Sequence, residues 1–256
     1  MLKKNNTDEI SKEQLKLNSD KIRERELKIK VIKIGLLIML LFLVIIYFIL
    51  RIIYETGDFT ISLDPNFAQK QGLVMYENKD EKVDRRVLNA TKVEFMDNIS
   101  VKWLPNNLDE LGDGSHNGDN YLAYTFYLEN RGSDVINYWY EIIVDDIIKN
   151  VDKAIRVMVY LNGEKTLYAK ANETTGEPEE GTVPFYSSRE IMVNGRKEFK
   201  PGDVDKFTIV IFLEGDDPDC VDALIGGEMK MHMEIVEEHI KQDKYKENQE
   251  TTEDNQ

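Results

Sequence analysis

The chain has 256 residues, 41% of them hydrophobic, which is enough for one or two domains with a core. Residues 1–33 hold ten Lys/Arg against six Asp/Glu, net +4, and the other residues hold 23 against 42, net −19. Because an acidic domain repels phosphate groups, we expect no nucleic-acid partner and no docking of the domain's body on anionic lipids. Cys220 is the only cysteine, which excludes an intramolecular disulfide and multi-cysteine metal sites.

A long apolar stretch follows a basic N-terminal segment, residues 1–30, which is too short for a catalytic domain. Ile34–Leu50 carries no charge over 17 residues. Lys33 and Arg51 can extend toward the membrane surface, which lengthens the span to residues 31–53, about 34 Å at ~1.5 Å per residue. Since the hydrocarbon core is about 30 Å thick, we predict a transmembrane helix over 31–53.

Two alternatives to a membrane anchor are open. A buried core helix would normally carry a polar face, and this stretch has none. A cleaved signal peptide would need small residues after the apolar run, whereas RIIYETGDF is bulky and charged. Five Lys/Arg precede the span between residues 23 and 33, while its other side has Arg51 and then acids. The positive-inside rule therefore predicts a single-pass cell-membrane protein with a cytoplasmic N-terminus and an extracellular C-terminal domain.

Apolar and polar side chains alternate with a period of two in several runs after the span, which is typical of half-buried strands. Leu122–Leu128 and Ile136–Val144 are two such runs, joined by a turn-rich connection, and we expect them to be neighbouring antiparallel strands. Ile155–Leu161 is followed by Asn162-Gly163 and a further run, which predicts a β-hairpin. Other strands are expected at Phe59–Leu63, Phe207–Leu213 and Met229–Ile235, with one to three more in Thr91–Trp103.

Many short strands and few helical segments favour a mainly β fold over a parallel α/β sheet. We predict an antiparallel β-sandwich, immunoglobulin-like or jelly-roll, formed by residues 54–240 as one extracellular domain. The polar segments 172–182 and 241–256 predict a surface loop and a disordered acidic tail, respectively.

Two segments carry a resemblance to a known family. Asp113–Asp134, DGSHNGDNYLAYTFYLENRGSD, and Phe199–Ile235 resemble Gram-positive surface proteins related to camelysin and TasA, and more closely the membrane-anchored members of that group. The resemblance covers most of residues 56–236. It implies an immunoglobulin-like or jelly-roll sandwich exposed at the cell surface. The retained anchor differs from the secreted members, so assembly into matrix fibres is not implied.

The loop DGSHNGDN is the best candidate for a metal site. Its oxygen-bearing residues alternate before Gly118, as in the first half of a calcium-binding loop. The position of the bidentate glutamate is Tyr124, so neighbouring acids would have to supply the missing charge. The alternative is a solvated loop stabilised by Asx turns. The candidate calcium ligands are Asp113, Ser115, Asn117 and Asp119; no other cofactor is expected.

A second acidic cluster, residues 214–219, follows a predicted strand. Its carboxylates are expected to cap a short helix at Cys220–Ile225, with calcium coordination as the alternative. Cys220 is expected to be a small core residue or a residue near the cap rather than a nucleophile, because no histidine lies near it in sequence.

Camelysin-type proteins are described as metallopeptidases, so the three histidines, His116, His232 and His239, were compared with zinc motifs. Neither H-E-x-x-H nor H-x-x-E-H occurs, and no P-loop, dinucleotide fingerprint or nucleophile elbow is present. His232 alternates with methionines and is expected to face outward.

The sequence thus predicts a non-enzymatic surface module for adhesion, envelope structure or assembly, with a surface protein as its possible partner. The alternatives are an extracellular ligand or signal sensor coupled to a cytoplasmic partner, and a surface metallohydrolase.

Overall fold

The computed structural model describes residues 27–48, 59–93, 95–172 and 175–237, together with residues 23 and 25. The chain divides into two compact units, Met1–Thr56 and Gly57–Gln256, and each is described by itself. The predicted tail 241–256, His239 and most of the segment 1–30 lie outside the described residues, as do residues 49–53 of the predicted span.

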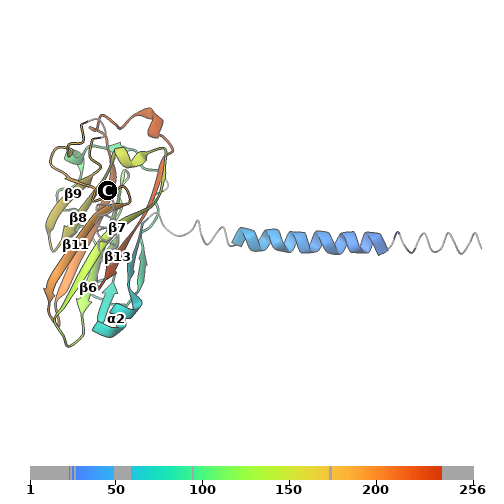
Figure 1. Cartoon of the computed structure of the whole chain (residues 1–256), viewed down its shortest axis with the longest axis horizontal. Coiled ribbons are helices and arrows are strands. Elements are labelled where there is room, and N and C mark those ends of the chain that lie inside the picture. Colours follow the sequence, from blue (N-terminus) through green and yellow to red (C-terminus); the bar gives the residue numbers. More distant parts are fainter. Residues whose placement is uncertain are drawn as a thin grey trace, which may run out of the picture. The chain divides into compact units, whose positions relative to one another are not determined.

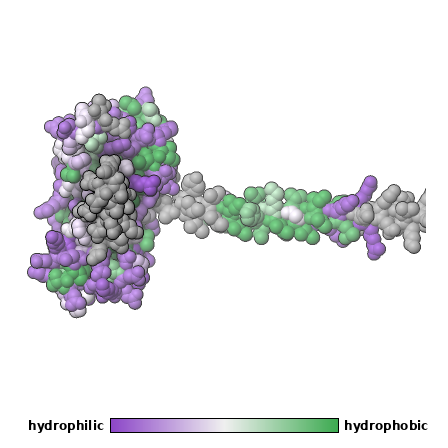
Figure 2. Space-filling model, in the orientation of Figure 1, coloured by the Kyte–Doolittle hydropathy of each residue, from purple (hydrophilic) through white to green (hydrophobic). Residues whose placement is uncertain are grey.

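The first unit contains a helix, Leu27–Phe48, of 22 residues. At ~1.5 Å per residue this helix is about 33 Å long, enough to cross a hydrocarbon core of about 30 Å. None of its most apolar window is buried. Figure 2 shows the helix as apolar along its visible face, with hydrophilic side chains at one end. It is one candidate membrane-spanning helix near the N-terminus, and it begins four residues before the predicted start at residue 31.

The second unit is a mainly β sandwich of two sheets (Figure 1). The first sheet has five strands in the spatial order β11 (Glu190–Phe199), β7 (Ile136–Ile148), β13 (Glu228–Val236), β1 (Phe59–Leu63) and β3 (Val87–Asn89). The second has the order β10 (Val183–Pro184), β9 (Glu164–Ala169), β8 (Ile155–Leu161), β12 (Val204–Glu214), β6 (Tyr121–Asn130) and β2 (Leu73–Tyr76), with β4 (Asn98–Ile99) beside β12 and β5 (Gly114–Ser115) beside β6. Most pairings are antiparallel, as expected, but β1–β13, β4–β12 and β9–β10 are parallel.

The main core lies between the two sheets and is built from the predicted apolar faces. Leu122, Tyr124, Phe126 and Leu128 of β6 are buried in it, as are alternate residues of β7, β8, β12 and β13. Phe126 stacks on Phe207 with ring centroids 5.1 Å apart. These strand faces were therefore predicted correctly.

The expectation that the strands are half-buried is wrong for β6, β8 and β12, the central strands of the second sheet. A smaller apolar cluster covers its outer face, where side chains of β6, β8 and β12 pack under the segment 99–108. This segment carries two 3₁₀ turns, η1 (Val101–Trp103) and η2 (Leu108–Glu110). β8 and β12 are consequently buried on both faces, which agrees with their nearly continuous apolar sequences.

The expected pairing of the runs 122–128 and 136–144 is also wrong. β6 pairs with β12 and β2, whereas β7 pairs with β11 and β13 in the other sheet. The connection between them crosses from one sheet to the other, so the two apolar faces meet across the core instead of side by side. The predicted hairpin is confirmed: β8 pairs with β9, and Asn162 and Gly163 both have positive φ at its turn.

One α-helix, α2 (Pro65–Gln71), lies at one end of the strands, and the 3₁₀ turn η4 (Asp222–Leu224) lies at the other (Figure 1). Asp64 caps α2 by accepting a hydrogen bond from the Phe67 amide at 2.7 Å, and Pro65 occupies the first turn. Gly72 ends the helix in the left-handed conformation. A Cβ atom on Gly72 would lie 2.7 Å from the Gly132 backbone, so this contact between α2 and the β6–β7 connection requires glycine.

The remaining predicted elements have mixed outcomes. Strands at Phe59–Leu63, Phe207–Leu213 and Met229–Ile235 are confirmed. The segment Thr91–Trp103 contributes the short strand β4 and the turn η1. The described part of the loop 172–182 is exposed or half-buried, as expected.

Candidate functional site

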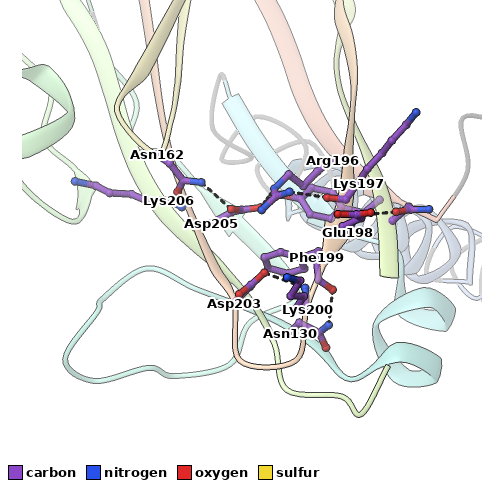
Figure 3. A network of polar contacts seen from close by, with 12 residues as sticks. Asn130, Asn162, Arg196, Lys197, Glu198, Phe199, Lys200, Asp203, Asp205 and Lys206 are labelled. Carbon is purple, nitrogen blue, oxygen red and sulfur yellow. Dashed lines mark hydrogen bonds and ion pairs between the residues drawn. The ribbon is translucent and has the colours of Figure 1, made fainter. Parts of the chain in front are cut away.

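The end of the sandwich beside α2 is closed by a buried carboxylate that joins the two sheets. Asp205 of β12 is 2% exposed. It accepts hydrogen bonds from the Tyr138 hydroxyl of β7 at 2.5 Å, from Asn162 Nδ2 at 2.7 Å and from Arg196 Nε of β11 at 3.2 Å. Burial and the Asp205 carboxylate raise the pKa of Tyr138, so this hydroxyl stays protonated and donates. Figure 3 shows Asp205 between Asn162 and Arg196.

A buried amide completes the same end. Asn130 Nδ2 donates to the carbonyl oxygen of Asp134 at 2.9 Å. It also donates to the carbonyl oxygen of Phe199 at 3.0 Å (Figure 3). Its Oδ1 accepts a hydrogen bond from the Gly132 amide at 2.9 Å. We call the part of the sandwich that contains α2, Asn130 and Asp205 the closed end.

The opposite end of the sandwich holds a pocket of about 460 Å³. Its floor consists of core residues at the strand ends farthest from Asp205, and all of them are buried. The walls come from residues 92, 93 and 95–98 and from the segment 220–228. The floor residues are Phe59, Leu122, Ile155, Ile211, Met229 and Met231. We call this part of the sandwich the pocket end.

Apolar side chains surround the pocket mouth. Phe95 is 74% exposed, Val221 is 52% exposed and Ile225 is 67% exposed, and all three line the pocket. The Lys149 ammonium donates a hydrogen bond to the Ile225 carbonyl at 2.5 Å, which ties the second wall to the end of β7. Large apolar side chains in solvent beside an apolar pocket are a common feature of ligand-binding sites.

Acidic groups outnumber basic groups among the residues that line the pocket. Asp97, Asp222 and Glu228 supply three carboxylates, and Lys92 supplies one ammonium, which is engaged in an interaction of its own. The mouth therefore favours a positively charged group over a negatively charged one.

The acidic cluster at residues 214–219 anchors the second wall and does not cap a helix. Asp217 forms a buried ion pair with Arg156 of β8. Glu214 accepts hydrogen bonds from the amides of Val101 and Asp216, both at 3.0 Å. The expected cap is wrong: the helical turn is only Asp222–Leu224, and no side chain caps it.

Cys220 is half-buried in the wall of the pocket. Burial, followed by the charges of Asp217 and Glu214, raises the pKa of its thiol. A thiol that resists ionisation is a poor nucleophile.

The predicted calcium loop lies beside β6, and its side chains make separate hydrogen bonds. Asp113 accepts from the Tyr127 hydroxyl at 2.7 Å and from the Lys79 amide at 3.0 Å. The Ser115 hydroxyl accepts from the Thr91 amide at 2.7 Å. Within the described ranges, no three His, Cys, Asp or Glu side chains are grouped as a metal site.

Asn117 connects two backbone segments, with Oδ1 accepting from the Ala123 amide and Nδ2 donating to the Thr91 carbonyl, both at 2.9 Å. Ser115 and Asn117 thus hold the segment around Thr91, which precedes the first wall of the pocket. Asp119 lies near Tyr121, whose pKa is raised first by burial and then by the Asp119 charge. Calcium binding by this loop stays a prediction.

The two described histidines make different contacts. Each ring nitrogen of His116 lies 3.0 Å from a carbonyl oxygen, that of Gly114 or of Leu108. His232 lies on the outer side of β13, as expected, between Asp145 at 2.9 Å and Glu234 at 3.2 Å. The hydrogen bond to Glu234 and the nearby Asp145 raise the pKa of His232.

Sequence reasoning missed the pocket, the Asp205 junction and the Arg156–Asp217 pair. A charge inside a run of apolar strand residues was the available signal for both polar groups: Arg156 interrupts β8, and Asp205 stands at the start of β12. The pocket had no such signal, because its lining comes from segments far apart in the sequence.

Comparison with known proteins gives weak likeness in solved structures. The chain matches neither a family model nor a curated protein. A β-glucosidase from Kluyveromyces marxianus in complex with glucose aligns with 63% of this chain and 15% of its own, at 16% identity and a TM-score of 0.22. A selenomethionine-labelled crystal of a β-glucosidase from the same organism aligns with 63% of this chain and 16% of its own, at 15% identity and a TM-score of 0.22. The alignment spans only a small share of either enzyme's length.

Proposed function

We propose that this protein is a single-pass membrane protein that carries a non-enzymatic binding module on the cell surface, in adhesion, envelope structure or assembly. The observation that carries the proposal is the pocket of about 460 Å³, which lies at one end of a sandwich whose other end is closed. Its size falls within the range of roughly 300–1,000 Å³ that is typical of ligand sites.

The charge distribution supports an outward-facing domain. Lys28, Lys30 and Lys33 lie in or beside the first helical turns, on the N-terminal side of the apolar stretch. Basic residues at that flank favour a cytoplasmic N-terminus. The resemblance to Gram-positive surface proteins points to the same location.

Protease treatment of intact cells that express the protein tests this orientation. We expect degradation of the β domain, with protection of an epitope placed within residues 1–25. The reverse pattern, a protected β domain on intact cells, would overturn the proposal. Permeabilised cells provide the control, because both parts should then be degraded.

A sensor is the second candidate function, and one observation favours it. Phe59, which forms part of the pocket floor, follows the helix Leu27–Phe48 after only ten residues. A ligand in the pocket would thus contact the strand that is directly connected to the helix. Deletion of residues 2–22 should abolish a ligand response if the protein is a sensor and leave surface binding intact if it is a binding module alone.

A further inference from the structure

We propose that the pocket end binds a single alkyl or acyl chain whose polar end carries positive charge. This inference rests on the proposed function, because it names the ligand class of the same pocket.

The size of the pocket suits one flexible chain. At about 30 Å³ for each water-sized group, 460 Å³ has room for roughly fifteen such groups. That volume accommodates one chain of moderate length and is too small for a complete lipid with two chains.

The lining suits an apolar and flexible ligand. The floor is formed by buried aliphatic and aromatic side chains, without a charged group among them. Met96, Met229 and Met231 add unbranched and polarisable side chains that can adjust to a tail of variable conformation.

The mouth determines which polar end is accepted. Phe95, Val221 and Ile225 would cover the part of the chain nearest the solvent. Beyond them, Asp222 and Glu228 oppose an anionic head group and attract a cationic one. Lys149, which follows β7 and donates to the Ile225 carbonyl, keeps its positive charge, but together with Lys92 it is outnumbered by the carboxylates of Asp97, Asp222 and Glu228.

A source of such chains lies within reach of the domain. The eleven residue steps from Phe48 to Phe59 extend to about 40 Å at most, at ~3.6 Å per residue. This chain length sets an upper limit on the distance between Phe59 and the end of the helix. The shared chemistry, an apolar chain with a quaternary ammonium in its head group, is found in free amphiphiles and in choline lipids, where a phosphate precedes the ammonium.

Photo-crosslinking of the full-length protein in lipid nanodiscs tests the proposal, since detergent would itself compete for an apolar pocket. The probes are dodecyltrimethylammonium and dodecanoate, each with a diazirine in the chain. After illumination, labelled peptides are identified by mass spectrometry. We expect the cationic probe to label segments 92–98 and 220–231 severalfold more than the carboxylate probe does. Labelling of residues 27–48 confirms that both probes reach the protein.

Exposed apolar residues provide matched variants that should fold normally. Val221→Lys and Ile225→Lys place a positive charge at the apolar mouth, where it would repel the cationic end group, and should remove labelling of the pocket peptides by dodecyltrimethylammonium. Val135→Lys alters a valine at the closed end that is 58% exposed, and it should leave labelling unchanged. The proposal is overturned if the pocket peptides are labelled no more than the other domain surface, if dodecanoate labels them equally, or if Val221→Lys has no effect.

A third probe separates the two sources. Phosphatidylcholine with a diazirine in one acyl chain should label the same peptides if bilayer lipid supplies the chain. Labelling by dodecyltrimethylammonium alone would identify a free amphiphile. The protease test of membrane orientation is independent of all these results, so failure of the ligand proposal leaves the proposed surface location intact.

The unique thiol gives a second readout that needs no variant. Because Cys220 is in the pocket wall, its reaction with a water-soluble disulfide reagent should slow severalfold when dodecyltrimethylammonium is bound. An unchanged rate at a concentration that gives full crosslinking would contradict binding inside the pocket.

Discussion

The two ends of the sandwich differ in how the core between the sheets is covered. At the closed end, Asp205 and Asn130 satisfy polar groups from both sheets, and α2 covers the strands. At the pocket end, the core reaches a cavity, and exposed apolar residues surround it. Buried polar networks fix the relative position of packed elements, whereas an unfilled apolar cavity forfeits packing contacts. The comparison is in line with our proposal that the pocket end is the binding site, and it predicts that the closed end contributes more to stability.

The largest expected effect comes from breaking the polar junction at the closed end. Asp205→Leu would leave the buried Tyr138 hydroxyl and the Asn162 amide without an acceptor and Arg196 without its partner. We expect a loss of about 3–4 kcal/mol in the free energy of unfolding, measured by urea denaturation.

Two variants control for this prediction. Asp205→Asn keeps an acceptor of the same shape and should cost less. Asp222→Leu removes an exposed carboxylate at the pocket end and should change the free energy of unfolding by less than about 0.5 kcal/mol. Equal losses for Asp205→Leu and Asp222→Leu would remove the distinction between the ends.

A smaller difference in the free energy of unfolding is expected between two leucine-to-alanine variants, one at each end of β6. Leu128 and Leu122 both belong to β6 and are both buried, but only Leu122 lines the pocket. Leu128→Ala should cost about 3 kcal/mol, as usual for a packed core. Leu122→Ala should cost about 1–2 kcal/mol less, because Leu122 lacks packing partners on the cavity side. Thermal and urea unfolding of both variants measure the difference, and a larger loss for Leu122→Ala would show that the pocket end is the better packed.

The strand faces were predictable because one physical pattern determines them. Alternation of side chains across a strand places Leu122, Tyr124, Phe126 and Leu128 on one side, and burial of that side follows from their apolarity. The Asn162-Gly163 turn was equally local, since both residues tolerate positive φ.

Pairing between strands was not predictable in the same way. The apolar faces of β6 and β7 are compatible with neighbouring strands in one sheet or with strands in two facing sheets. Which arrangement forms depends on how all the strands pair. The pocket was harder still to predict. Its walls come from two segments, near residues 92–98 and 220–228, that are far apart in the sequence and come together only when the sandwich folds. The carboxylates at 214–219 suggested capping of a helix. Asp217 instead forms an ion pair with buried Arg156, which is far away in the sequence.

The free energy of unfolding should also depend on pH through His232, which belongs to neither end and lies on the outer side of β13. The hydrogen bond to Glu234, together with Asp145, raises the pKa of His232 above 6.5. A raised pKa in the folded state stabilises the fold below the unfolded pKa, and this contribution is lost as pH rises through the folded value. The free energy of unfolding should therefore fall as pH increases from about 6 through that raised value.

His232→Gln isolates this contribution. The difference between wild type and variant should be largest at acidic pH and disappear at alkaline pH, while other titrating groups cancel. Asp145→Asn should reduce the difference, since it removes one of the two carboxylates beside the ring. A wild-type advantage that grows with pH would contradict the assigned contacts.

The smallest expected effect concerns calcium and the loop DGSHNGDN. Coordination by Asp113, Ser115 and Asn117 would require their oxygens to release four hydrogen bonds, from the Tyr127 hydroxyl and from the amides of Lys79, Thr91 and Ala123. A bound ion at one hundred times its Kd would stabilise the fold by about 2.7 kcal/mol, but the loss of these hydrogen bonds weakens the Kd itself, so millimolar calcium would not reach that ratio. We expect the melting temperature in millimolar calcium to equal that in excess chelator. Asp113→Ala should lower both values equally, because it removes the contacts with Tyr127 and Lys79. A melting temperature that rises with calcium in the wild type, and does not rise in Asp113→Ala, would instead establish the loop as a calcium site that rearranges on binding.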